Sequence, residues 1–176
     1  YQGTLPGDDT PVYALACPAL YERPGGPYVD PDGRDWPDNA LRFGMLSRVA
    51  ALFGCEGGLA HWLADVIHAN DWQTGLSAAQ LAYMPEARAR VVLTVHNIAF
   101  QGNFPRETLT DLALPPLSFG LNGVEYFGRV SFLKAGLVYA DHIVAVSPSY
   151  AREIQTSAFG SGMEGVVAAR RDRLSG

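Results

Sequence analysis

The fold is decided by a short apolar run, Val91-Val-Leu-Thr-Val95, which lies between Arg90 and His96. The run has no charged residue and is rich in valine, a composition typical of a β-strand. Because the run is apolar at consecutive positions and does not alternate with polar residues, it fits a strand buried on both faces, as in a parallel sheet. We therefore expect residues 90–96 to form one strand of a parallel sheet.

Strand-like and helix-like segments alternate on both sides of this run. The pattern predicts further strands at 12–16, 65–70 and 142–146, and helices at 38–54, 74–83, 127–139 and 166–176. Ser147 and Pro148 open one more helix, as its N-cap and its first residue. Strands separated by helices predict an α/β fold, namely a Rossmann-like parallel sheet with helices on both faces, in a single domain over 1–176.

Two stretches fit neither pattern. Residues 17–37 carry five of the twelve prolines, which predicts an irregular excursion. Residues 97–123 are rich in Pro, Gly, Asn and Phe. A loop of that length inside a compact domain is usually functional or partly structured.

Composition limits the classes of partner. The chain has 176 residues, 48% of them hydrophobic, and a net charge of −5 at pH 7. There is no basic run, so no nucleic-acid partner is expected, and no apolar run approaches the roughly 18 residues of a membrane span. The first residues lack the features of a signal peptide, and the missing initiator Met suggests a start inside a longer reading frame. The sequence leaves the oligomeric state open.

The two cysteines, Cys17 and Cys55, lie far apart in apolar surroundings and without metal-binding spacing. We expect reduced thiols in a cytoplasmic protein.

His96 stands out because ligands of open parallel sheets bind at the carboxyl ends of the strands. It closes the 90–96 strand and is followed by Asn97 and a loop that contains Gly102. Its ring either binds a ligand hydroxyl or caps its own loop by bonding a backbone carbonyl. Position alone leaves both possibilities open.

Asp71 and Trp72 follow the 65–70 strand. The Asp71 carboxylate either bonds sugar hydroxyls and stabilises developing positive charge, or serves as the N-cap of the next helix. Trp72 is either a stacking surface for a sugar or, as we favour, a core residue.

Two further residues have a functional and a structural interpretation. Tyr28, in a turn-rich loop, either stacks on a nucleobase or sugar or, as we favour, packs the loop down. Lys134, the only lysine of the chain, is either a phosphate ligand or, as we favour, a side chain that extends along its helix to solvent.

Several common motifs are absent from the sequence. There is no GxGxxG after the first strand, no GxxxxGK followed by Ser or Thr, no GxSxG and no metal-spaced cluster of His, Asp and Glu. A Rossmann oxidoreductase is therefore disfavoured. The residues by themselves predict a crevice-forming α/β domain with His96, Asp71 and aromatic side chains directed at a polar ligand.

Several long segments resemble bacterial glycogen (starch) synthases. The longest are Asp65-Val-Ile-His-Ala-Asn-Asp-Trp-Gln-Thr-Gly75 and Thr94-Val-His-Asn-Ile-Ala-Phe-Gln-Gly102, and the others are 20–28, 131–136, 139–142, 146–153 and 162–165. The resemblance follows the chain in order over essentially its whole length. It implies part of the N-terminal half of a GT-B glycosyltransferase of family 5 type, which transfers glucose with retention from ADP-glucose to the non-reducing end of an α-1,4-glucan. No metal or other cofactor is implied.

The same resemblance implies roles for individual residues. His96 matches the histidine at the donor glucose, where its ring would bond a sugar hydroxyl and its carbonyl would face the charge that develops at C1. Asp71 matches an aspartate of the catalytic cleft, and Tyr28 matches an aromatic residue at the ADP-glucose site. Asn97 and Gln101 are implied as sugar contacts.

The chain departs from the family in its extent. The Lys-x-Gly-Gly-Leu loop that grips the donor phosphates and the C-terminal domain are both absent, so we expect the 176 residues alone to be inactive. Two alternatives stay open. UDP-glucose could replace ADP-glucose, since the base-contacting residues lie largely in the C-terminal domain, or the chain could be a noncatalytic sugar- or nucleotide-binding α/β module.

Overall fold

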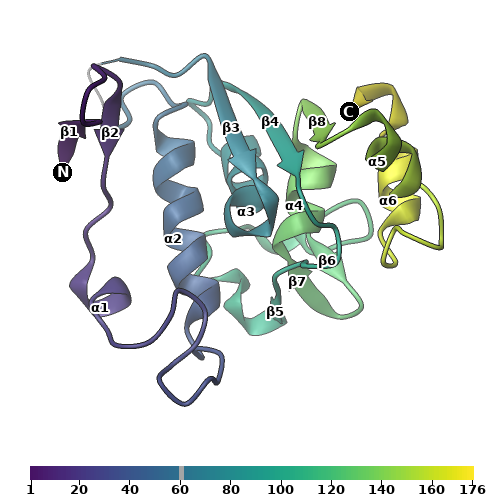
Figure 1. The fold of residues 1–176 in the computed structure, drawn as a ribbon, viewed down its shortest axis with the longest axis horizontal. Coiled ribbons are helices and arrows are strands. Elements are labelled where there is room, and N and C mark those ends of the chain that lie inside the picture. The colour runs from purple at the N-terminus through teal and green to yellow at the C-terminus, as the bar shows by residue number, and fades with distance from the viewer. Residues whose placement is uncertain (60–61) are drawn as a thin grey trace.

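A four-stranded parallel sheet forms the centre of the computed structural model, which describes residues 1–59 and 62–176. The strands lie in the order β3 (Val66–Asn70), β4 (Arg90–Val95), β8 (His142–Ala145) and β9 (Leu174–Ser175). Figure 1 shows β3, β4 and β8 side by side. The apolar run 91–95 therefore belongs to an inner strand, and the predicted α/β class with a parallel sheet is confirmed.

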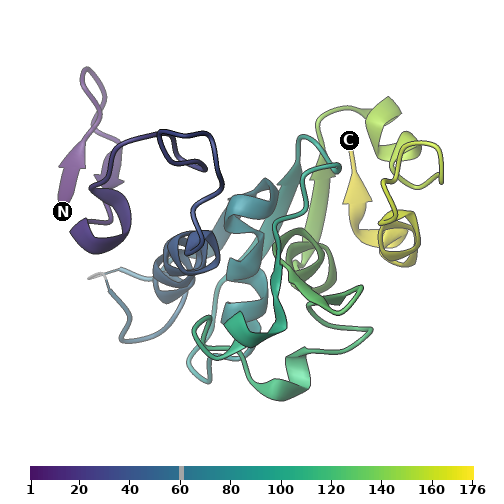
Figure 2. The same cartoon turned by 90° about the horizontal axis from the view of Figure 1, so that it is seen from below.

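The helices α2 (Asn39–Leu52), α3 (Asp71–Ala82) and α4 (Phe132–Tyr139) lie along one face of β3 and β4 (Figure 2). On β3, Ile67 and Ala69 are buried beneath this layer, whereas Val66 and His68 on the opposite face are exposed. The strand order follows the chain order, and right-handed connections that advance in one direction place their helices on the same face. On β3 and β4, helices therefore cover one face, as predicted, and the other predicted helical layer is not seen over these two strands.

Two hydrophobic clusters stabilise this arrangement. One lies between the sheet and the helices and includes Leu93, Leu133 and Ile143. The other lies between α3, α4 and the segment that follows β4, and includes Leu76 and Phe132. Glycines let α3 and α4 approach closely, since a Cβ on Gly75 would lie 2.5 Å from the carbonyl oxygen of Phe132.

The N-terminal strand differs from its prediction. Instead of a strand at 12–16 in the main sheet, β2 (Pro11–Tyr13) pairs antiparallel with β1 (Gln2–Thr4). This hairpin lies on the side of α2 away from the sheet (Figure 1). Its turn contains Gly7 at φ +79°, and the Asp8 carboxylate accepts the backbone N–H of Thr10 at 2.9 Å. Turn residues of this kind favour pairing between the two strands that flank the turn over pairing with a strand far away in the sequence. A short helix, α1 (Pro18–Tyr21), interrupts the irregular stretch that follows.

The long segment after β4 is partly structured, as expected. It contains β5 (Asn103–Pro105), the 3-10 helices Arg106–Leu109 and Pro116–Ser118, and then β6 (Glu125–Tyr126) and β7 (Arg129–Ser131), which form a small antiparallel sheet in the order β5-β7-β6. The predicted helix at 127–139 is therefore wrong in its first turn. Phe127 and Gly128 have positive φ angles, which make the turn between β6 and β7.

The C-terminal part confirms one prediction and overturns another. Ser147 caps α5 (Pro148–Glu153), since its Oγ accepts the backbone N–H of Tyr150 at 3.1 Å. The helix predicted at 166–176 is wrong beyond its first residues. After α6 (Glu164–Ala169) and a 3-10 helix at Arg171–Arg173, the chain turns back as β9 and pairs in parallel with β8.

Candidate functional site

Two residues predicted from different strand ends lie together at the carboxyl edge of the sheet. Asp71 follows β3 and His96 follows β4. One carboxylate oxygen of Asp71 accepts the backbone N–H of His96 at 2.7 Å and that of Asn97 at 3.3 Å. The strand-end rule placed both residues at this edge of the sheet, and the structure adds the hydrogen bond between them.

Asp71 has an unusual backbone conformation, with φ at +51°. Asp is one of the few residues with a side chain that adopt this left-handed region readily. The conformation turns the carboxylate across to β4, so Asp71 does not act as the N-cap of α3. The residue before the helix is Asn70, whose backbone is held by the hydroxyl of Thr74. The capping alternative for Asp71 is therefore wrong.

The imidazole of His96 is exposed and lies with Nε2 3.1 Å from the side-chain oxygen of Asn70. This contact crosses from β4 to β3, so the ring does not cap its own loop. The neighbouring Asn97 uses its side-chain oxygen to accept the backbone N–H of Ala99 at 3.0 Å, which shapes the loop.

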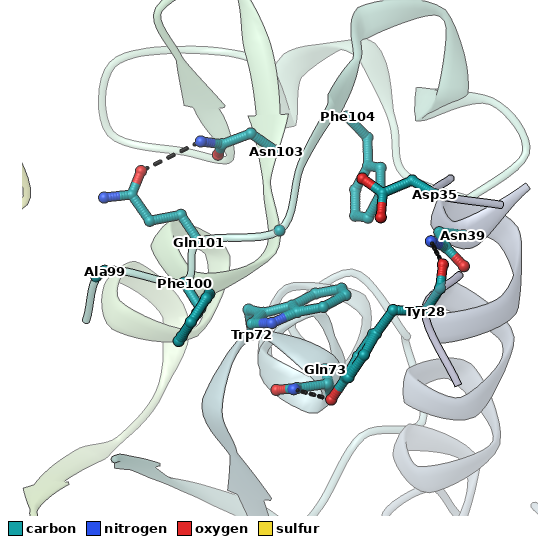
Figure 3. Close-up of a pocket in the computed structure, with 11 residues that line it drawn as sticks. Tyr28, Asp35, Asn39, Trp72, Gln73, Ala99, Phe100, Gln101, Asn103 and Phe104 are labelled. Carbon is teal, nitrogen blue, oxygen red and sulfur yellow. Dashed lines mark hydrogen bonds between the residues drawn. The ribbon is translucent and has the colours of Figure 1, made fainter. Parts of the chain in front are cut away.

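A cavity of about 600 Å³ opens at Trp72, the residue that follows Asp71 (Figure 3). It draws its wall from the irregular stretch before α2, from the start of α3 and from the loop after β4, and the lining residues are Tyr28, Asp35, Asn39, Trp72, Gln73, Ala99, Phe100, Gln101, Gly102, Asn103 and Phe104. Of the five predicted site residues, Tyr28 and Gln101 line this cavity. His96, Asp71 and Asn97 lie next to it along the chain.

Trp72 forms the floor of the cavity. Its ring packs against Phe43, with 4.6 Å between centroids, and against Tyr28 and Phe104, at 5.9 Å each. Gly102, at φ +57°, sits directly on the indole, where a Cβ would lie 2.3 Å from the ring. Trp72 packs against both hydrophobic clusters, as the favoured role predicts, but it is only partly buried, and the same ring presents a surface to the cavity.

Amide side chains line the cavity on both sides of this floor (Figure 3). Gln73 donates to the hydroxyl of Tyr28 at 2.7 Å, and Asn103 donates to the side-chain oxygen of Gln101 at 3.2 Å. Gln101 in turn donates to the carbonyl of Ser161 at 2.9 Å. The side-chain oxygen of Asn103 is buried and accepts no hydrogen bond from any described residue.

Sequence reasoning missed Asp35, Asn39, Gln73 and Asn103. Asp35 and Asn39 reach the cavity only because the irregular stretch before α2 folds back over the helix, where Asn39 donates to the carbonyl of Tyr28 at 2.8 Å. No periodic pattern marks such a path. The sequence offered one signal for Gln73 and Asn103, namely that they follow the predicted residues Asp71 and Gln101 by two positions.

Lys134 has neither of its two predicted roles. Its side chain is buried, and its ammonium donates to the carbonyls of Leu121, at 2.7 Å, and Glu125. Burial lowers the pKa of the ammonium, and the nearby Glu125 carboxylate opposes that shift. Lys134 thus ties the segment before β7 to α4.

Two general features of the described residues complete the site. No three His, Cys, Asp or Glu side chains among them are grouped so as to hold a metal ion. None of the helices in residues 1–59 and 62–176 combines the length and the apolar composition needed to cross a membrane.

Comparison with known proteins gives consistent matches. The family described as the starch synthase catalytic domain matches residues 1–169. The glycogen synthase of Paramagnetospirillum magneticum is 55% identical over 175 residues, which cover 99% of this chain and 35% of that protein. The glycogen synthase of Nitrosomonas europaea is 51% identical over 166 residues, covering 94% of this chain and 34% of that protein. The chain thus spans about a third of the length of these relatives.

A solved structure is similar as well. The catalytic domain of starch synthase IV from Arabidopsis thaliana, bound to ADP and acarbose, superposes with a TM-score of 0.69 at 26% identity. The superposition covers 80% of this chain and 30% of that one.

Proposed function

Because this chain belongs to the starch synthase catalytic domain family, we propose that it supplies one side of the active site of a retaining glucosyltransferase. The enzyme moves glucose from ADP-glucose to the non-reducing end of an α-1,4-glucan. The relatives, of which the chain spans about a third, are glycogen synthases, and the similar plant structure carries ADP and acarbose.

The observation that carries this proposal is the cavity that opens at Trp72, the residue after Asp71. Its floor is the Trp72 ring, and Tyr28, Gln73, Gln101 and Asn103 surround that floor. Aromatic faces pack against the C–H faces of a sugar, while amides bond its hydroxyls in both donor and acceptor roles. A cavity that combines an aromatic face with amide side chains, at the carboxyl edge of the sheet, suits a glucose unit better than a planar cofactor.

His96 acts at the transferred glucose. We assign its ring to a sugar hydroxyl and its backbone carbonyl to the positive charge that develops at C1 in the transition state. The Asp71 carboxylate, 2.7 Å from the His96 amide nitrogen, fixes that backbone and adds negative charge beside it. Fixed charges and dipoles aimed at developing charge are the usual source of large rate effects.

The chemistry needs no metal in this proposal. The bond from C1 to the donor diphosphate breaks as the acceptor hydroxyl attacks from the same side. The leaving diphosphate takes the hydroxyl proton, so one glycosidic bond forms as the other breaks and ADP leaves. Tyr28 lines the donor side, and Asn97 and Gln101 contact sugar hydroxyls.

The test uses a protein of the relatives' full length that contains this chain. Radiolabelled glucose from ADP-glucose is expected to enter maltooligosaccharides, and His96→Ala lowers kcat by at least about a hundredfold. A parallel assay with UDP-glucose identifies the donor. No incorporation from either donor, in a protein whose circular dichroism shows it folded, would refute the transferase.

A noncatalytic sugar-binding module is the second candidate, favoured by the fact that an aromatic ring and amide side chains of this chain line one cavity together. Calorimetry with maltooligosaccharides distinguishes the two. Binding by the full-length protein without any glucose transfer supports the module.

We also place the protein in the cytoplasm. Both cysteines are unpaired, and Cys55 is buried. Unpaired thiols are usual in a reducing compartment.

A further inference from the structure

Strand register brings Asn70 to His96. In the parallel pair of β3 and β4, Asn70 lies beside Thr94. Side chains two positions apart on a strand share a face, so His96 emerges on the same side as Thr94 and Asn70. This is the open face, where His68 and Asn70 are exposed.

Asn70 presents its oxygen to His96 for a definite reason. Its amide nitrogen lies 3.4 Å from the carbonyl oxygen of His68, which only accepts hydrogen bonds. The NH₂ group therefore faces His68, and the side-chain oxygen faces Nε2 of His96 at 3.1 Å. The backbone on which this amide stands is held by Thr74, whose hydroxyl accepts the Asn70 N–H at 2.6 Å and donates to the Asn70 carbonyl at 2.9 Å.

An amide oxygen opposite Nε2 determines where the imidazole proton lies. Because the oxygen can only accept, Nε2 must carry the hydrogen, and in the neutral ring Nδ1 is then the acceptor. A sugar hydroxyl that approaches Nδ1 would therefore donate a hydrogen bond to this nitrogen. The ring also stays in one orientation, because the backbone N–H of His96 is held as well, by its hydrogen bond to the Asp71 carboxylate.

We propose that Asn70 is a positioning residue that sets the tautomer and the orientation of the His96 ring, so that Nδ1 faces the ligand as a hydrogen-bond acceptor. This inference rests on the proposed function, in which His96 contacts the transferred glucose. It assigns a role to a residue that touches no substrate itself.

A spectroscopic experiment tests the tautomer directly on the chain as it stands. Long-range proton–nitrogen NMR spectra at a pH where the ring is neutral are expected to show the His96 hydrogen on Nε2 alone. Asn70→Ala should leave a mixture of tautomers, and Asn70→Asp, which keeps an acceptor in place, should restore the single form. His68→Ala is the matched control, because it removes another exposed side chain of the same face, one that bonds Thr94 and not His96, and it should leave the His96 signals unchanged.

Kinetics in the full-length protein supply the second measurement. We expect Asn70→Ala to lower kcat/KM by about three- to tenfold, the effect of one hydrogen bond, mainly through kcat. A wild-type ring with its hydrogen on Nδ1, or an Asn70→Ala spectrum identical to wild type at His96, overturns the inference. The proposed function fails separately, through absence of glucose transfer in the wild type, whatever the spectra show.

Discussion

Asp71 combines two roles that substitutions can separate. Its left-handed backbone and its bonds to the His96 and Asn97 amides are structural, whereas its charge acts on the proposed transition state. Asn tolerates the same backbone and keeps the acceptor oxygen, whereas Ala does neither.

We therefore expect Asp71→Ala to lower the free energy of unfolding by about 2–3 kcal/mol, and Asp71→Asn by less than about 1 kcal/mol. Urea denaturation measures both. Asp71→Asn should nevertheless reduce kcat by about a hundredfold, because the carboxylate charge is lost. Full activity in Asp71→Asn would show that the carboxylate serves only to hold the loop.

Gly102 is the second residue on which the cavity depends. Trp72 cannot move away from a new Cβ, because Phe43, Phe104 and Phe132 pack around it. We expect Gly102→Ala to cost about 2–4 kcal/mol, from overpacking and from the positive φ together. Gly120→Ala is the control, since a Cβ there meets no atom within 4 Å. Equal stability of the two variants in thermal unfolding would contradict the packing argument.

At the level of residues, sequence alone placed His96 and Asp71 at the same edge of the sheet, because the ends of parallel strands meet there whatever the loops do, but it did not predict the hydrogen bond between them. It could not predict Asn39 or Asp35, whose positions depend on how an irregular stretch crosses a helix. The role of Lys134 was missed for a similar reason, since its carbonyl partners belong to a segment without periodicity.

Among the elements, α3 and α4 meet through a pair of tyrosines. The hydroxyls of Tyr83 and Tyr139 lie 2.8 Å apart. Burial, reinforced by the Tyr83 hydroxyl, raises the pKa of Tyr139 far above its usual value. Above pH 10 the unfolded chain ionises this group first, so the folded state loses stability as pH rises towards the raised pKa.

We expect the unfolding free energy to fall above pH 10, with at most about 1.4 kcal/mol per pH unit from Tyr139. Tyr139→Phe should be about 1 kcal/mol less stable at neutral pH, yet lose less stability between pH 10 and 11. Urea titrations at a series of pH values give both quantities. Tyr1→Phe, at an exposed position, should reproduce the wild-type slope, and an unchanged slope in Tyr139→Phe would refute the assignment.

Elements with strong local signals were predicted well. The valine-rich run gave β4, and Ser147 with Pro148 gave the start of α5. The failures were β2, β7 and β9, which are two or three residues long. Such short strands form only where a partner strand lies beside them in the fold, and a local sequence pattern does not reveal that partner.

For the molecule as a whole, an edge strand follows directly on an exposed apolar segment. β3 is an edge strand of the described sheet, and Leu59, Trp62, Leu63 and Val66 before and within it are exposed by 39–56%. Of these residues, Trp62 also belongs to an aromatic cluster with Tyr13 and Phe53. We call Leu59, Trp62, Leu63 and Val66 the apolar edge surface. Surfaces of this kind promote association.

The 176-residue chain on its own should therefore bind an apolar dye and self-associate with rising concentration. Leu63→Ser combined with Val66→Thr should reduce both, as followed by dye fluorescence and sedimentation velocity. Leu117→Ser changes a residue that is 75% exposed elsewhere and should have little effect. A chain that stays monomeric and dye-free would show that the apolar edge surface is too small to matter.

The one-directional order of the sheet bears on how the protein is made. β3, β4, β8 and β9 leave the ribosome in the order in which they pair, and every new strand adds to the one that emerged before it. Within the described part of this sheet, no strand after β3 has to wait for a later segment before it finds its neighbour, and none has to be inserted between two that are already joined. The sheet can therefore grow during translation, with each helix covering its strand as synthesis proceeds.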